Sequence, residues 1–178
     1  MLALSLVATP ARAIELLRDA DLEHGLKQLA APVLRAAGLS PNRVKILVVN
    51  SGSLNAFVVS NDAIFLHHGL ISKLSSAASL QAVIAHEAAH IANGHITRRM
   101  TNLGAARNIA ALGLALAAAA AAAGSGDAAF GLAAGTQSAA QRAFLRHTRA
   151  EEASADQSAI RYLRAAGIAP QGMRDVLE

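Results

Sequence analysis

The sequence predicts a single α+β domain that is mostly helical and contains a small three-stranded sheet. Short apolar and β-branched runs all lie between residues 43 and 68, whereas nearly everything after Gly69 has helical character. Runs of strands followed by runs of helices are typical of α+β folds rather than alternating α/β folds. A chain of 178 residues, 53% of them hydrophobic, is long enough to bury the core of one domain.

The N-terminus resembles the end of an export signal. The stretch LALSLVATPARA is a short apolar run that ends in Ala11, Arg12 and Ala13, the A-x-A arrangement of a cleavage site. No basic segment precedes this run, so an ordinary N-terminal helix is the alternative. We interpret residues 1–13 as a signal-peptide remnant and residues 14–178 as the functional domain, and we expect a periplasmic or exported protein.

The predicted elements follow in order along the chain. Helical periodicity between Ile14 and Leu39 predicts two helices, interrupted at Pro32 and closed by Gly38. The runs RVKILVVN, NAFVVS and AIFLHH predict three strands, and the turn residues SND between the last two indicate a hairpin. Further helices are expected from about Leu80 through the sequence IAHEAAHIANGH, from about 138 to 166, and from 170 onward.

An alanine-rich segment separates the last two long helices. Residues 109–123 contain no charge, and the sequence GSGD at 124–127 then breaks the helix. We expect a helical hairpin over residues 105–135 that either covers the active site as a lid or lies against a membrane surface. A spanning role is less expected, because crossing a bilayer needs about 20 strongly apolar residues and alanine is weakly apolar.

Composition restricts the function. The chain has no cysteine, so any metal must be held by histidine and carboxylate side chains. Its net charge of +4 is scattered, and its aromatic residues are one Tyr and four Phe, which argues against a nucleic-acid partner.

A histidine pair indicates a metal site. His86, Glu87 and His90 form the motif H-E-x-x-H within a predicted helix. His86 and His90 lie about 40° apart around the helix axis and about 6 Å apart along it, so both can bind one ion, usually zinc. Glu87 projects about 100° away from His86, outside the ligand set but able to reach a metal-bound water as general base. Chance produces this motif in about 1% of such chains.

The third ligand must come from elsewhere, and residues 148–163 offer Glu151, Glu152 and Asp156. Glu152 and Asp156 are one helical turn apart on one face. One carboxylate can then bind the ion while the other accepts the N–H of a ligating histidine. We assign Glu152 as the third zinc ligand and Asp156 as the partner of one histidine. A solvated acidic face beside Arg149 is the alternative for this segment taken alone.

His95 is expected to have a structural role. If the helix continues that far, His95 points about 160° away from the histidine pair and cannot bind the same ion. Hydrogen bonding is then its expected role, although Asn93 and Gly94 can end the helix first.

Several stretches together resemble one protein family: LRDADLEHGLKQLAAPVLRAAGL, LNAFVV, IFLHHGLI, LQAVIAHEAAHIANGH and TRAEEASADQSAIRYLRAAGIAP. They resemble the HtpX and CaaX-prenyl-endopeptidase group of zinc metallopeptidases (metallopeptidase family 48), most closely its periplasmic BepA-like branch. The resemblance implies a zincin-like (gluzincin) catalytic domain in which the E-x-x-x-D pair maps onto Glu152 as ligand and Asp156. Ser154 stands where the family usually has a second acid.

The resemblance also implies how substrate binds. In this fold the edge strand before the active-site helix pairs with an extended substrate, and that strand would be Asp62–His67. Asn55, Ala56 and Phe57 match a family motif beside it, for which packing is the expected role. Relatives carry a tetratricopeptide tail after the protease domain, and this chain ends at Glu178 without one, so we expect that partner binding placed there is either absent or was cut off.

The sequence therefore predicts a zinc-dependent metalloendopeptidase with one Zn²⁺ per chain, acting in protein quality control on unfolded or misassembled envelope and outer-membrane proteins. Three ligands leave a fourth position for water, and Glu87 takes its proton as it attacks the peptide carbonyl. The alternative is a latent or non-catalytic zinc-binding, chaperone-like module in outer-membrane protein assembly. Peripheral membrane contact of the alanine-rich segment is the alternative to its role as a lid.

Overall fold

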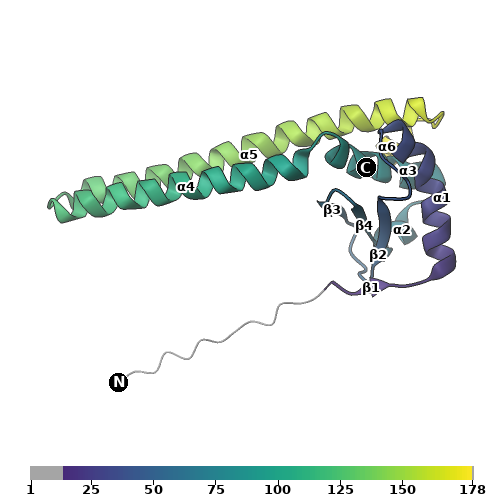
Figure 1. Cartoon of the computed structure of the whole chain (residues 1–178), viewed down its shortest axis with the longest axis horizontal. Helices are drawn as coiled ribbons and strands as arrows, with labels where there is room; N and C mark the ends of the chain where they lie inside the picture. Colours follow the sequence, from purple (N-terminus) through teal and green to yellow (C-terminus); the bar gives the residue numbers. More distant parts are fainter. Residues whose placement is uncertain (1–13, 178) are drawn as a thin grey trace, which may run out of the picture.

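The computed structural model describes residues 14–177 and contains a small mixed sheet, helices packed against it, and a long helical hairpin that extends away from both (Figure 1). The mostly helical α+β class predicted from the sequence is confirmed. The signal-peptide remnant expected at residues 1–13 lies outside the described residues.

The sheet has four strands in the order β1-β2-β4-β3: β1 (Leu16–Leu17), β2 (Lys45–Val49), β3 (Ala56–Ser60) and β4 (Ala63–His67). β2 and β4 are parallel, whereas β1 pairs with β2 and β3 with β4 in antiparallel fashion. The three predicted strands and the β3–β4 hairpin are confirmed. The two-residue strand β1 was not predicted, because an element this short shows no periodicity.

The predicted edge strand was wrong. β4, which covers most of Asp62–His67, lies inside the sheet between β2 and β3, and the edge beside it is β3. The physical reason is burial: Ile64 and Leu66 on β4 are fully buried, whereas Val59 on β3 is exposed. A strand with such buried residues belongs in the sheet interior, where both of its edges are paired.

The first helical segment is one helix, α1 (Ala20–Ala36), rather than the two predicted. Its N-terminus is capped by the Asp19 carboxylate, which accepts the N–H groups of Asp21 and Leu22 at 3.0 Å. Pro32 lies inside the helix and removes one backbone hydrogen bond. Packing offsets this loss, because Val33 and Leu34, directly after Pro32, are buried in the core.

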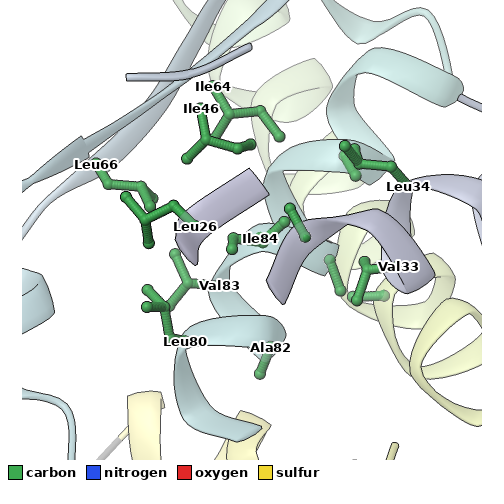
Figure 2. Packing of buried hydrophobic residues seen from close by; sticks show 14 of the residues in the cluster. Leu26, Val33, Leu34, Ile46, Ile64, Leu66, Leu80, Ala82, Val83 and Ile84 are labelled. Atoms are coloured by element: carbon green, nitrogen blue, oxygen red, sulfur yellow. The ribbon is translucent and has the colours of Figure 1, made fainter. Parts of the chain in front are cut away.

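The hydrophobic core lies where α1 and α3 (Ala77–Ala92) pack against the sheet, and Figure 2 shows its central side chains. The members labelled in Figure 2 come from both helices and from the two interior strands: Leu26, Val33, Leu34, Ile46, Ile64, Leu66, Leu80, Ala82, Val83 and Ile84. Because α3 is buried along most of its length, its polar residues are held in place by the surrounding core.

The end of α3 sets the direction of the chain that follows. Gly94 adopts a left-handed conformation with φ 68°, which side chains other than glycine disfavour. α3 therefore stops at Ala92, and α4 (His95–Ala122) begins in a new direction. The short helices α2 (His68–Lys73) and α6 (Gly172–Leu177) complete the described elements.

The alanine-rich segment lies in a helical hairpin built from α4 and α5 (Gly126–Ala165). α5 is one continuous helix of 40 residues, whereas the sequence suggested two separate helices here, the second arm of the 105–135 hairpin and a helix from about 138 to 166. Its C-terminal part packs on α3, while the distal parts of α4 and α5 project away from the sheet (Figure 1). α5 therefore connects the exposed tip of the hairpin to the domain core.

Candidate metal centre

Three predicted ligands come together where α3 meets α5. His86 and His90 occupy successive turns of α3, and their Nε2 atoms are 3.1 Å apart. Glu152 approaches from α5, with its Oε2 atom 3.2 Å from His86 Nε2 and 3.4 Å from His90 Nε2. Among the described residues, this is the group of histidine and carboxylate side chains with the spacing to hold a metal ion.

The spacing of the donor atoms fits zinc. Zinc bonds to histidine nitrogen and carboxylate oxygen are about 2.0–2.1 Å long, and tetrahedral geometry then separates neighbouring donor atoms by about 3.3–3.4 Å. The three observed separations of 3.1, 3.2 and 3.4 Å are close to that value. Two imidazoles and one carboxylate are also a usual donor set for zinc with an open fourth position.

Asp156 orients the first histidine. Its Oδ1 atom lies 2.8 Å from His86 Nδ1. Because an ionised carboxylate can only accept hydrogen bonds, His86 Nδ1 carries the proton, and the lone pair of Nε2 faces His90 and Glu152. The sequence left open which histidine Asp156 would contact, and the structure places it on His86.

His95 contacts the other histidine. Its Nδ1 atom lies 3.0 Å from His90 Nδ1, and the side chain is only 1% exposed. The expected hydrogen-bonding role is confirmed. The expected direction of His95, which assumed that the helix continues to it, does not apply because α3 ends before His95. The chain reversal at Gly94 brings His95 back against His90.

Burial keeps His90 neutral. The residue is 4% exposed, and burial, together with the nearby charge of His86, lowers the His90 pKa to about 4. A neutral imidazole has a free lone pair for a metal, so His90 is in its ligand form throughout the neutral pH range.

Glu87 lies next to His86 on α3 but outside the group formed by His86, His90 and Glu152. The residue is 7% exposed, and burial raises the pKa of its carboxyl group to about 7. The charge of His86 opposes this rise, whereas that of Glu152 adds to it. A carboxyl group with a pKa near neutrality can both accept and release a proton, which is the property required of a general base and acid.

Sequence reasoning missed Arg99 on α4. Its Nε atom donates to Glu151 Oε2 at 2.9 Å, and its Nη2 atom donates to Glu152 Oε1 at 3.1 Å. Arg99 thus fixes the orientation of Glu152 and forms an ion pair with the buried Glu151. The predicted turn at residues 124–127 could have indicated this contact. Residues equally far from the turn of an antiparallel hairpin lie side by side, and Arg99 lies 25 residues before Gly124 whereas Glu151 lies 26 residues after Ser125.

Asn93 ties the end of α3 to α5. Its amide group donates to Ser158 Oγ at 3.0 Å and lies 3.3 Å from Ser154 Oγ. Ser154, which replaces the usual family acid, therefore contributes to the packing of the two helices that carry the predicted ligands. His67 and His68 lie outside the cluster, where they bond to Ser53 Oγ and the Ser51 carbonyl.

Comparison with known proteins agrees with this arrangement. Residues 17–177 match the family model described as Peptidase family M48. The chain belongs to this family. A beta-barrel assembly-enhancing protease from Yersinia pestis is 28% identical over 131 residues, covering 74% of this chain and 27% of that protein. The protein of the same name from Escherichia coli K12 is 25% identical over 163 residues, covering 92% of this chain and 33% of that protein.

This M48 domain spans a third or less of the length of those two relatives. The family match over residues 17–177 includes the helices that carry His86, His90 and Glu152.

Proposed function

We propose that this chain is a zinc-dependent metalloendopeptidase, with His86, His90 and Glu152 as the zinc ligands and Glu87 as the general base. The observation that carries the proposal is the tetrahedral spacing of the three donor atoms beside a buried carboxyl group whose pKa is near 7. Membership of Peptidase family M48 supports peptide-bond hydrolysis as the reaction.

The chemistry divides between the metal and the protein. When bound, zinc supplies a Lewis acid that polarises a peptide carbonyl and lowers the pKa of a water molecule. Glu87 accepts a proton from the attacking water and passes it to the leaving amine. Asp156 holds the His86 ring, and His95 holds the His90 ring, so that both lone pairs stay directed at one point.

The number of ligands favours catalysis over a purely structural metal. Structural zinc sites are closed by four protein ligands, whereas catalytic sites use three and leave one position open. In the described part of the chain, the cluster has three members, and Glu152 retains partial exposure, so the open position can be reached from solvent.

The edge strand β3 is the proposed binding surface for substrate backbone. The Asn55 carbonyl accepts the His67 N–H at 2.9 Å, and the register of β3 then directs the backbone groups of Ala56 and Val58 toward the open edge. β3 also contacts both α3 and α4. An extended chain that adds to this edge gains backbone hydrogen bonds without a sequence requirement, which suits unfolded substrates.

The proposed substrates are unfolded or misassembled envelope proteins, including outer-membrane proteins, in the periplasm or another exported location. The support is the name of the two relatives, beta-barrel assembly-enhancing protease. A latent or non-catalytic zinc-binding module is the competing function.

Cleavage of unfolded casein by the chain, compared with Glu87→Gln, tests the proposed base. The variant is expected to keep its zinc and to lose at least about 100-fold in kcat/KM. A matched control, Glu23→Gln on the surface of α1, is expected to cleave at the wild-type rate. Retained cleavage in Glu87→Gln contradicts the assignment of the base. Zinc binding without cleavage in the wild type supports the latent module instead.

The edge strand has its own test. Val58→Pro removes one outward backbone N–H, whereas Val58→Thr has similar volume and keeps it. We expect KM for casein to rise about tenfold in the proline variant with kcat little changed, because one substrate hydrogen bond is lost. Equal KM values for the two variants, at equal zinc content and helicity, count against substrate pairing with β3.

A further inference from the structure

The two oxygen atoms of the Glu152 carboxylate have different surroundings. Oε2 is the oxygen that approaches the histidine pair, at 3.2 Å from His86 Nε2 and 3.4 Å from His90 Nε2. Oε1 accepts a hydrogen bond from Arg99 Nη2 at 3.1 Å. One oxygen therefore faces the histidines, while the other is held by a charged donor that comes from a different helix.

Arg99 is itself anchored by a second carboxylate. Its Nε atom donates to Glu151 Oε2 at 2.9 Å, and Glu151 is only 7% exposed. Nε and Nη2 lie on the same edge of the planar guanidinium group, so these two bonds leave the group little freedom to turn. Glu151 therefore fixes the Arg99 side chain, and the fixed side chain restrains Glu152.

The two contacts require the geometry of an arginine. Glu151 and Glu152 are adjacent on α5, so their side chains leave the helix about 100° apart. The guanidinium group presents separate donors in a fixed fork that can bridge two such carboxylates, whereas the ammonium group of a lysine is a single point charge. A lysine at this position would not hold both carboxylates in the same arrangement.

One face of α4 supports two of the predicted ligands. His95 and Arg99 are four residues apart in α4, so they lie on the same side of the helix in successive turns. His95 contacts His90, and Arg99 contacts Glu152. The first turns of α4 therefore orient a ligand from α3 and a ligand from α5.

The second oxygen of a carboxylate ligand affects the space around a metal ion. Carboxylates bind metal ions through one oxygen or through both. Because both oxygens are bonded to the same carbon, a small rotation of the Glu152 side chain would turn Oε1 toward the histidine pair as well. Catalytic zinc sites use three protein ligands and keep a fourth position for water. A Glu152 side chain that bound through both oxygens would compete with water for this position.

We propose that Arg99 is a positioning residue that keeps the fourth coordination position open by holding Glu152 Oε1 away from the metal. The proposal rests on the proposed function, because it takes His86, His90 and Glu152 as the ligands. The hydrogen bond joins two charged groups, and the Arg99 side chain is only 37% exposed, so water and salt weaken this bond less than they weaken a fully exposed ion pair.

Imidazole binding to the cobalt-substituted whole chain tests the proposal. Co²⁺ accepts the donor atoms of zinc sites, and its visible absorption changes when imidazole enters an open position. Because imidazole is neutral, loss of the Arg99 charge has little direct effect on its binding. Arg99→Met is expected to keep one Co²⁺ per chain and to bind imidazole at least about tenfold more weakly than the wild type, because Oε1 is then free to take the fourth position.

Two variants separate this role from a loss of charge or of stability. Arg98→Met removes the same charge at the exposed neighbouring position, and it is expected to bind imidazole like the wild type. The double variant Arg99→Met, Glu151→Gln also removes the buried carboxylate that Arg99→Met leaves unpaired, so it should be more stable than Arg99→Met. It still lacks the donor to Oε1 and is expected to bind imidazole as weakly as Arg99→Met.

Three results would overturn the proposal. The first is wild-type imidazole affinity in Arg99→Met with one Co²⁺ bound. The second is recovery of imidazole affinity in the double variant, because the effect would then come from the unpaired Glu151 carboxylate. The third is loss of Co²⁺ from the folded double variant, because Arg99 would then hold Glu152 on the metal instead of keeping a position open.

Casein cleavage by the zinc-loaded chain gives a second measurement. Arg99→Met is expected to lose at least about tenfold in kcat with KM little changed, because the position for the attacking water is restricted while the β3 edge is unaltered. A wild type that binds no metal, or that binds metal and cleaves no casein, contradicts the proposed function. Equal imidazole affinity in Arg99→Met and the wild type contradicts the role of Arg99 alone, so the two proposals are tested separately.

Discussion

His95 Nδ1 lies 3.0 Å from His90 Nδ1, the ring nitrogen of His90 that does not face the metal cluster. If His90 Nε2 binds zinc, its Nδ1 must carry the proton and donate it to His95. A buried neutral imidazole thus takes the place that a carboxylate or carbonyl oxygen usually has behind a ligating histidine. Asp156 has the corresponding place behind His86.

Removing the partner of His90 is expected to weaken zinc binding. His95→Ala should lower zinc affinity by about 10–100-fold, because the His90 ring loses the acceptor that fixes its tautomer. His95→Gln keeps an acceptor oxygen and should recover part of the loss. Competition with a chromophoric chelator measures both, with His24→Ala on the exposed face of α1 as control. Wild-type affinity in His95→Ala contradicts this role.

The partner of His86 is expected to behave in the same way and independently. Asp156→Ala should also lower zinc affinity by about 10–100-fold, and Asp156→Asn should lower it less because an amide oxygen can still accept. Because Asp156 and His95 contact different histidines, the double variant should bind zinc more weakly than either single variant. Asp127→Ala, at the hairpin tip, is the control. A double variant no weaker than either single variant argues against separate roles.

Most of the structure that could be predicted followed from local sequence patterns. H-E-x-x-H predicted that His86 and His90 share a face, because a four-residue spacing in a helix fixes that relationship without tertiary information. The strand topology could not be read in this way. β4 is interior because it pairs in parallel with β2, a contact that depends on how distant segments pack. The prediction of two helices separated at Pro32 was wrong for a similar reason, since core packing keeps α1 continuous past Pro32.

Arg99 is expected to stabilise the fold through Glu151. Arg99→Met leaves the buried Glu151 carboxylate without its partner, and should lower the free energy of unfolding by about 1–3 kcal/mol, after allowance for the partial exposure of Arg99. Adding Glu151→Gln removes the unpaired charge and should recover much of the loss. Urea unfolding measures both, and Arg98→Met, at the exposed neighbouring position, should change stability by less than about 0.5 kcal/mol. If the double variant is as unstable as Arg99→Met, the unpaired Glu151 carboxylate is not the cause of the lost stability.

Glu87 is expected to make the metal-free protein less stable as pH rises. Its pKa is about 7 in the folded chain against an ordinary value of 4.5, so between these values the folded state binds more protons than the unfolded state. The free energy of unfolding therefore falls across this window, by on the order of 3 kcal/mol. Glu87→Gln cannot ionise, so its stability relative to wild type should increase from about pH 4.5 to 7 and then level off.

Urea unfolding in the presence of a chelator, at a series of pH values, measures this difference. His90, whose lowered pKa causes stability to be lost as pH falls from 6.5 toward about 4, is present in both proteins and cancels in the comparison. A difference between Glu87→Gln and wild type that does not change with pH shows that the Glu87 pKa is not raised.

Zinc titration of the metal-free chain, with bound zinc and casein cleavage measured on the same samples, is the most direct test of the proposed metallopeptidase. Cleavage is expected to rise in proportion to bound zinc and to stop at about one zinc per chain, while Glu152→Ala gains neither tight zinc nor activity. Cleavage that persists without zinc, or one tightly bound zinc with no cleavage, contradicts the proposed function.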